Sequence, residues 1–164
     1  MAKIVNNPSI KEEKIDIARS CIEHRAIWMA LFYDEMVKAG VPNAEEITRK
    51  AIYRCGQYHG GIFKEMCAGS TDCRVFSEAF MPEVDRKEFE MELDNRVDEI
   101  HIDFHYCPLV SAWQKIGCDE ERISKLCDMA MDGDRGIVAT NGLKLDLMET
   151  IADGYPTCKM LIHK

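Results

Sequence analysis

The chain has 164 residues, of which 46% are hydrophobic and 30% are charged, and its formal net charge is -8. Length and composition favour one soluble domain and exclude disordered or fibrous structure. The acidic balance argues against a nucleic-acid partner, because phosphate binding needs concentrated basic surface. No apolar run approaches the roughly 20 residues that cross a bilayer. The N-terminal stretch MAKIVNNPSIKEEKIDIA reaches a proline and charges before a signal-type core. We therefore expect a cytoplasmic protein without membrane contact.

Two long helices are predicted in the first part of the chain. Ser9 and Glu12 have capping-box spacing, and apolar residues then recur at helical intervals to about residue 39. Gly40-Val41-Pro42 ends this helix, and Asn43 to Glu46 supplies a second capping signal. The second helix is predicted to end near Gly69. Its expected buried stripe comprises Ile47, Ala51, Cys55, Tyr58, Ile62 and Met66. Residues of about 10–69 thus form a helical hairpin.

Three glycines interrupt the second predicted helix. Gly56, Gly60 and Gly61 each cost up to about 1 kcal/mol relative to alanine inside a helix. Close helix packing is the favoured reason, ahead of a ligand against the backbone.

The remainder, about 72–164, is predicted to mix helices and strands. A short helical piece spans about Asp72 to Phe80, and Pro82 breaks the chain before a two-residue alternation begins at Phe89. The later elements are a turn at LDNRV, a strand through HIDFHYC, a helix from Pro108 to Gly117, a helix capped by Asp119 or Cys118, a strand over Gly142 to Thr150 and a last strand, TCKMLIHK. The predicted fold class is α+β. It comprises one domain, in which the N-terminal helical hairpin packs with a mostly antiparallel four-stranded sheet and two further helices.

The stretch HIDFHYCPLV supplies metal-ligand candidates. His101, Asp103 and His105 would share one strand face, and this donor set suits a divalent metal such as zinc, iron or manganese. The alternative is the solvated face of a one-sided sheet, with acidic partners on the preceding strand. We expect His101 and Asp103 to line such a face.

Cys107 lies at the end of the same predicted strand, directly before Pro108. A thiol at a helix N-terminus is stabilised as thiolate, so a lowered pKa is expected. His105 could act on it as a base or as a cationic partner. The alternative is that Cys107 fills the corner between strand and helix. The eight cysteines include no Cys-x-x-Cys pair and are expected to be free thiols, with Cys21, Cys55 and Cys67 inert on apolar stripes.

Three motifs carry a resemblance to a known family. HYCPLVSAWQKIG, LCDMAMDGD and ETIADGYPTCKML resemble the L-2-amino-thiazoline-4-carboxylic acid hydrolases, and YRCGQYHGG matches that family's glycine-rich helix more loosely. The ending is also similar to 4-vinyl reductase domains, whose cysteines bind a structural zinc. The residues that carry the resemblance over are Cys107, Cys127, Asp128, Cys158 and Thr150. Where the 4-vinyl reductase pattern has a further cysteine, this chain has Thr150.

The resemblance implies a hydrolase that opens a cyclic amidine, such as L-2-amino-thiazoline-4-carboxylate, to N-carbamoyl-L-cysteine at a carbon-nitrogen bond. Cys107, or a water bound by it, would attack the ring carbon, His105 would assist it, and Asp128 would be the acid or base.

Arg54 would hold the substrate carboxylate. Cys127, Cys158 and Thr150 would complete a substrate pocket on which Cys107, Cys127 and Cys158 converge.

Two other functions fit the same residues. One is a non-catalytic sensor domain that binds a small molecule or a metal, with the three cysteines around the ligand. The other is a metal-dependent hydrolase that uses His101, Asp103 and His105. In every case the expected partner is a small molecule, and the sequence gives no indication of oligomeric state.

Overall fold

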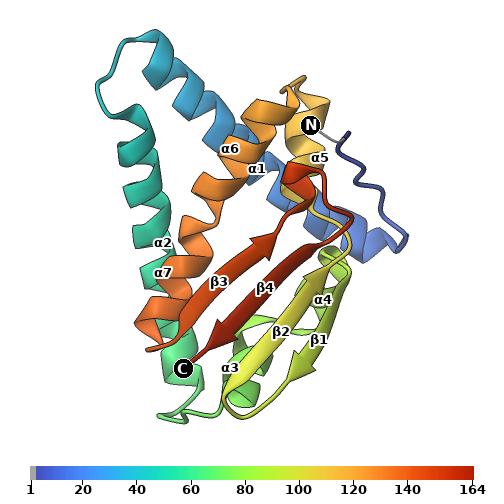
Figure 1. Cartoon of the computed structure of the whole chain (residues 1–164), viewed down its shortest axis with the longest axis vertical. Helices are drawn as coiled ribbons and strands as arrows, with labels where there is room; N and C mark the ends of the chain where they lie inside the picture. Colours follow the sequence, from blue (N-terminus) through green and yellow to red (C-terminus); the bar gives the residue numbers. More distant parts are fainter. Residues whose placement is uncertain (1–2) are drawn as a thin grey trace.

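The computed structural model describes residues 3–164. It has two layers, a sheet and a set of helices that covers one of its faces (Figure 1). The helices are α1 (Glu13–Lys38), α2 (Ala44–Met66), α3 (Cys73–Phe80), α4 (Glu83–Glu88), α5 (Pro108–Lys115), α6 (Glu120–Ala130), α7 (Asp132–Thr140) and the short 3-10 helix η1 (Ile151–Asp153). The strands are β1 (Met91–Asn95), β2 (Glu99–Phe104), β3 (Lys144–Glu149) and β4 (Cys158–His163). None of the described helices is both long enough and apolar enough to cross a membrane.

The sheet has the strand order β1-β2-β4-β3, and every neighbouring pair is antiparallel. The last strand therefore lies inside the sheet, between β2 and β3. Its first residue, Cys158, pairs with Phe104 at the end of β2. Helices and an antiparallel sheet that are segregated along the chain confirm the predicted α+β class.

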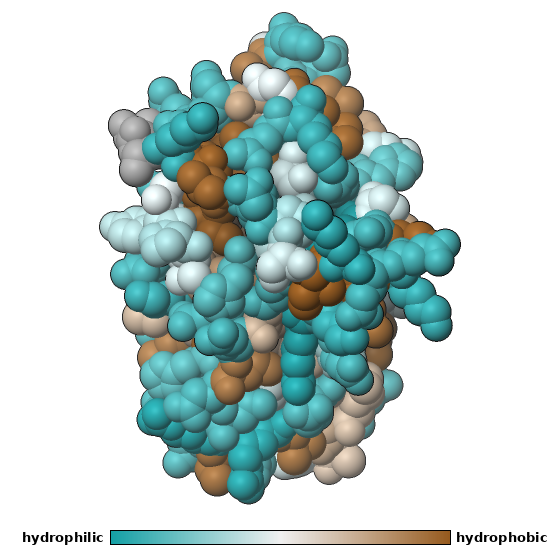
Figure 2. All heavy atoms as spheres, turned by 90° about the vertical axis from the view of Figure 1, so that its right-hand side faces the viewer, coloured by the Kyte–Doolittle hydropathy of each residue, from teal (hydrophilic) through white to brown (hydrophobic). Residues whose placement is uncertain are grey.

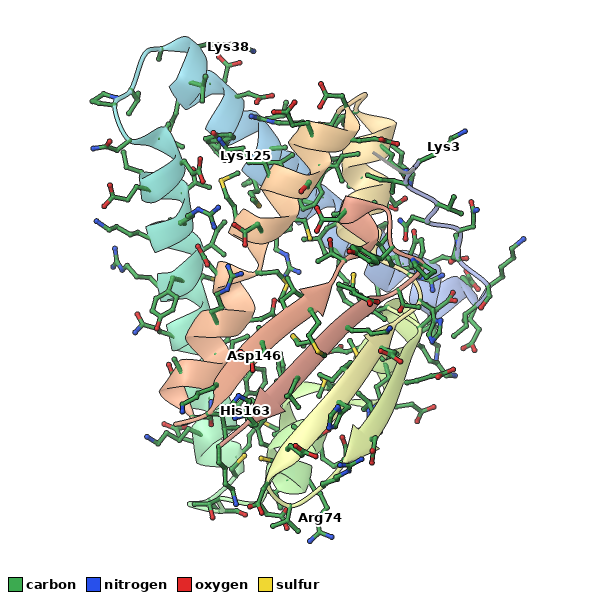
Figure 3. All side chains as sticks on the ribbon, in the orientation of Figure 1. Lys3, Lys38, Arg74, Lys125, Asp146 and His163 are labelled. Atoms are coloured by element: carbon green, nitrogen blue, oxygen red, sulfur yellow. The ribbon has the colours of Figure 1, made fainter. Side chains whose placement is uncertain are left out.

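One face of the sheet is buried and the other is wet. Ile100 and Ile102 of β2 are 0% and 1% exposed, whereas the His101 side chain between them is 43% exposed. On the same wet face, His163 Nε2 lies 3.1 Å from Asp146 Oδ2 (Figure 3). Lys159 of β4 pairs with Asp103 in the register. This alternation confirms the prediction that His101 and Asp103 line a solvated face.

Trp113 fixes α5 against α1. Its side chain is 0% exposed, and its indole Nε1 donates a hydrogen bond of 3.0 Å to the Ala26 carbonyl. A buried tryptophan needs such a partner for its N–H group. The surrounding core cluster contains residues from α1, α5, α6 and η1. A second cluster lies beneath the sheet.

Glycines allow α2 and α7 to pack backbone to backbone. A Cβ at Gly60 would lie 2.9 Å from the Ile137 carbonyl oxygen, and one at Gly56 would overlap the Gly133 carbonyl. Helix packing is thus confirmed as the reason for Gly56 and Gly60. At Gly61 a Cβ would meet nothing within 4 Å. Helix α7 was not predicted, because its glycines and aspartates weaken the helical signal.

This close packing overturns one expectation. The predicted buried stripe of α2, from Ile47 to Met66, is exposed, and Tyr58 within it is 71% exposed. The buried residues of α2 are instead small, including Thr48 and Gly56. Apolar periodicity located a face of the helix, but the face that packs is the one that permits the closest approach.

Local start signals were predicted with mixed success. The Ser9 backbone N–H and hydroxyl each donate to the Glu90 carboxylate at 2.7 Å, so Ser9 does not cap α1. Asn43 adopts a left-handed conformation with φ of 61° and makes no side-chain cap. Asp119 does cap α6, because its side chain accepts from the Arg122 N–H. Helix α4, directly after Pro82, was not predicted, and β1 begins at Met91, two residues after the predicted start of the alternation.

Arg19 joins α1 to the start of the sheet. Its side chain is 5% exposed and forms an ion pair of 3.0 Å with Glu90. It also donates to the carbonyls of Glu88 at 2.9 Å and Ile10 at 2.8 Å. Its guanidinium stacks 4.5 Å from the centre of the Tyr106 ring. A buried cation is tolerated here because its donors and its charge are satisfied.

Candidate functional site

A cavity of about 190 Å³ lies where α6, the end of β3 and η1 meet. Its walls include Cys127 and Asp128 from α6, Thr150 at the start of η1, and Asp153. The volume has room for several water molecules, at about 30 Å³ each, or for one small heterocyclic acid. Three residues singled out from the sequence therefore line one cavity of small-molecule size.

The three cysteines of the resemblance gather beside this cavity. Cys107 precedes α5, Cys127 lies on α6 and Cys158 begins β4, and all three pack against the same core cluster. Cys107 and Cys158 are both close enough to Cys127 that a negative charge on either would raise the pKa of Cys127. The Ile151 N–H donates to Cys158 Sγ at 3.2 Å. Placing β4 beside β2 brings these residues together although they are distant in sequence.

The expected lowering of the Cys107 pKa is wrong. Burial raises the pKa of this thiol to about 11, and the Val110 and Leu109 N–H groups at the start of α5 oppose the rise. The helix N-terminus thus acts in the predicted direction, but desolvation of the thiolate is the larger effect. At neutral pH the thiolate fraction is on the order of one in ten thousand.

The other two thiols are also neutral near pH 7. Burial, together with the charge of Cys107, raises the pKa of Cys158 to about 12. Burial and the neighbouring Cys107 and Cys158 raise the pKa of Cys127 well above its ordinary value. The cluster therefore presents S–H groups.

Asp128 is held by two arginines. Its carboxylate accepts from Arg49 at 2.6 Å and from Arg135 at 2.9 Å. Burial alone would raise its pKa, but these hydrogen bonds outweigh it and leave the pKa of Asp128 below its usual value. An ionised, doubly paired carboxylate is a poor proton donor. Asp128 is thus better suited to orienting the arginines at the rim of the cavity.

Thr150 and Asp153 form a polar wall. The Thr150 hydroxyl donates to Asp153 Oδ2 at 2.7 Å and accepts from the Asp153 N–H at 3.0 Å. The Ser124 hydroxyl, from α6, donates to the other carboxylate oxygen of Asp153 at 2.5 Å. This network caps η1 and links it to α6, so it fixes the relative positions of two elements that form the cavity wall.

Two predicted site residues lie elsewhere. His105 is exposed and pairs with Glu92 at 3.5 Å on the wet face of the sheet. Arg54 is exposed on α2, on the side of the helix away from Gly56. Neither residue joins the cysteines, because strand alternation and helix rotation turn both side chains outward.

Sequence reasoning missed Asp134 and Arg25. Their charges act on the Cys107 thiol, one raising and the other lowering its pKa. Burial raises the pKa of Asp134 to about 6, against the opposing charge of Arg25. Asp134 belongs to the unpredicted helix α7 and Arg25 to the middle of α1, so no local motif joins them.

Metal-ligand geometry is a separate question. Across residues 3–164, no three His, Cys, Asp or Glu side chains are arranged to hold a metal ion. The candidates His101 and His105 instead approach the carboxylates of Glu99 and Glu92.

The fold and the cavity define an α+β domain with a cavity of small-molecule size, which Cys127 lines, and with two further thiols beside it. The chain belongs to the L-2-amino-thiazoline-4-carboxylic acid hydrolase family, whose model matches residues 19–162. No curated protein matches it significantly.

Two solved structures share the fold. One is a trafficking protein particle complex subunit 3 from Naegleria fowleri, covalently bound to palmitic acid, with 12% identity and a TM-score of 0.55 over 86% of this chain and 95% of that one. The other is the phenol-responsive sensory domain of the transcription activator PoxR with phenol, with 15% identity and a TM-score of 0.50 over 84% of this chain and 73% of that one.

Proposed function

We propose that this chain is a hydrolase that opens a small cyclic amidine acid of the 2-amino-thiazoline-4-carboxylate type. The observation that carries the proposal is the cavity of about 190 Å³ lined by Cys127 and Asp128, in a chain of this family. A five-membered ring with one carboxylate suits its size and its mixed polar and thiol lining.

The chemistry of the product fixes which bond breaks. Water adds to the ring carbon between sulfur and nitrogen, and the carbon–sulfur bond then cleaves. The water oxygen becomes the carbamoyl oxygen and the sulfur leaves as the cysteine thiol. Of the two water protons, one ends on the former ring nitrogen and the other on the sulfur, so the single product contains the whole water molecule. The carbon–nitrogen bond persists in N-carbamoyl-L-cysteine. The expectation of a departing nitrogen is therefore corrected to a departing sulfur.

Water is the nucleophile in this proposal. The raised pKa of Cys107 leaves too little thiolate for attack at neutral pH. Asp134 does not line the cavity itself, but its charge acts on Cys107 in the adjoining thiol cluster. We propose it as the base that accepts the proton of the attacking water through an intervening water, and its pKa of about 6 suits that role. The neutral S–H group of Cys127 lines the pocket, and Cys158 lies beside it, so neither thiol adds a negative charge next to the departing sulfur.

Arg135 is the proposed carboxylate anchor in place of Arg54. It already holds Asp128 at the cavity rim, and its planar fork matches a carboxylate. Arg49 shares the same acidic partner, so Asp128 remains paired when Arg135 engages the substrate.

The test is turnover of L-2-amino-thiazoline-4-carboxylate, followed by chromatographic detection of N-carbamoyl-L-cysteine. We expect Asp134→Asn to abolish turnover while Cys107→Ser retains most of it. Cys127→Leu fills the cavity and should abolish binding, whereas Cys55→Leu on the surface should have no effect. If Cys107→Ser lost turnover and Asp134→Asn did not, the Cys107 thiol and not water would be the nucleophile.

The second candidate is a binding domain without turnover. It is favoured by the three neutral thiols, which are not activated for attack, and one fold relative is a sensory domain seen with phenol. Calorimetry distinguishes the two candidates. Heat of binding that is lost in Cys127→Leu, with no product formed by the unaltered chain, supports the binding domain.

A further inference from the structure

The hairpin of α1 and α2 has one covered side and one open side. On the covered side, α6 contacts α1, where the Arg122 guanidinium stacks 4.4 Å from the Tyr33 ring centre. Helix α7 covers α2 at Gly56 and Gly60. In Figure 1, α6 and α7 follow one another across the hairpin. The sides of α1 and α2 turned away from α6 and α7 are called the outer face below.

The outer face of α1 is apolar. Ile17, Trp28, Leu31 and Phe32 recur at helical spacing and are 49% to 64% exposed. The Trp28 and Phe32 rings make an edge contact with centroids 6.1 Å apart. In water such a run of aromatic surface is unfavourable unless something covers it.

The outer face of α2 carries a second apolar stripe. Ile47, Tyr58, Ile62 and Met66 are 42% to 71% exposed. These four and the four of α1 make up eight of the sixteen large hydrophobic residues that are exposed in the described chain. Of the other eight, Val37 lies near the end of α1 and the remaining seven lie outside the two helices. On the side of the molecule in Figure 2 the surface is mostly hydrophilic, and hydrophobic atoms form separate areas.

The size of the outer face matches what a dimer needs. A half-exposed side chain of this kind offers on the order of 100 Å² of surface, so eight offer on the order of 800 Å². A stable interface buries about 800 Å² on each partner. A single small ligand would cover far less.

The charge of the hairpin also permits a like partner. The chain carries a net charge of -8, yet α2 has four cationic residues against three acidic ones. The outer stripes themselves contain no charged side chain among the eight residues. Two copies can therefore meet at this face without bringing their acidic surfaces together.

We propose that a second copy of this chain docks on the outer face, forming a two-fold dimer in which two hairpins complete a four-helix layer. An isologous contact uses the same patch twice, so both stripes are buried in both copies. Antiparallel helix pairs with one apolar side each are the parts from which four-helix bundles are built.

Sedimentation equilibrium tests the proposal. At a chain concentration on the order of 100 μM, which is a hundredfold above a micromolar Kd, the unaltered chain should show twice its 18.8 kDa mass. Trp28→Glu and Tyr58→Glu, one from each stripe, should each give the mass of one chain while circular dichroism remains unchanged. The matched control is Val97→Glu, an exposed apolar residue in the turn between β1 and β2, which should stay dimeric.

Tryptophan emission gives an independent readout. Trp113 is buried in the chain and Trp28 is exposed, so dilution of a dimer should shift only the Trp28 emission to the red. A single-chain mass for the unaltered protein at the highest concentration would overturn the proposal, and so would a dimer that survives in either stripe variant.

Discussion

Two adjacent glycines in α2 should respond to alanine with opposite signs. Gly60 faces α7, where a Cβ would lie 2.9 Å from both the Ile137 carbonyl oxygen and Thr140 Cβ. Gly61 faces open space, with nothing within 4 Å of a Cβ. The two positions share the same helix and the same propensity change, so their difference isolates the packing of α2 on α7.

The magnitudes follow from two effects. Replacing glycine by alanine inside a helix stabilises it by about 1 kcal/mol, and Gly61→Ala should gain that amount. Overpacking costs typically about 1–3 kcal/mol. The upper end applies at Gly60, because the opposing atoms are largely backbone and cannot rotate away. Gly60→Ala should therefore lower the free energy of unfolding by about 2 kcal/mol net.

Urea unfolding at one protein concentration measures both changes. Thermal unfolding gives a second measurement, at about 2–4 °C per kcal/mol for a chain of this size. The midpoint temperature Tm should rise by about 2–4 °C for Gly61→Ala and fall by about 4–8 °C for Gly60→Ala. Equal effects of the same sign in the two variants would refute the reasoning, since the contact with α7 would then not distinguish them.

Three further outcomes are expected. Cys107 should react with a thiol alkylating reagent far more slowly in the native protein than after unfolding in urea, because burial raises its pKa to about 11; rapid native labelling would contradict this. The raised pKa of Asp134, about 6, means that the folded state binds more protons than the unfolded state between about pH 4 and 6. Stability should thus fall as pH rises through that window, and Asp134→Asn should flatten this part of the pH profile in urea titrations. Arg19→Ala should cost about 3–5 kcal/mol, because it leaves a buried carboxylate unpaired, and Arg19→Lys should recover only part of it; a change below 1 kcal/mol in Arg19→Ala would show that the pair is dispensable.

Periodicity predicted most of the elements but not which side of each one is covered. The sequence contained two stripes on α2, one of large apolar residues and one of small residues around Gly56. Burial followed the second, because close backbone packing against α7 depends on shape and not on hydropathy. The prediction of strands succeeded where alternation was strict, as at Ile100 and Ile102.

The candidate site was predictable only where a motif carried it. Cys127 and Thr150 line the cavity, and the resemblance had singled out both. Asp134 and Arg25 lie far apart in sequence and act on Cys107 only through the tertiary fold. The Cys107 pKa was misjudged for a related reason: the helix N-terminus is a local feature visible in the sequence, whereas the desolvation that exceeds it depends on everything packed around the thiol.

The place of β4 inside the sheet constrains the order in which the protein can form. Its neighbours β2 and β3 are complete before residues 158–163 have been synthesised, and until then both leave an unpaired edge. Such edges are templates for wrong pairing with other chains. The same late strand delivers Cys158 to the thiol cluster. Until residues 158–163 are available to pair, the chain has neither a closed sheet nor a complete thiol cluster beside the cavity, and both are acquired together when β4 inserts.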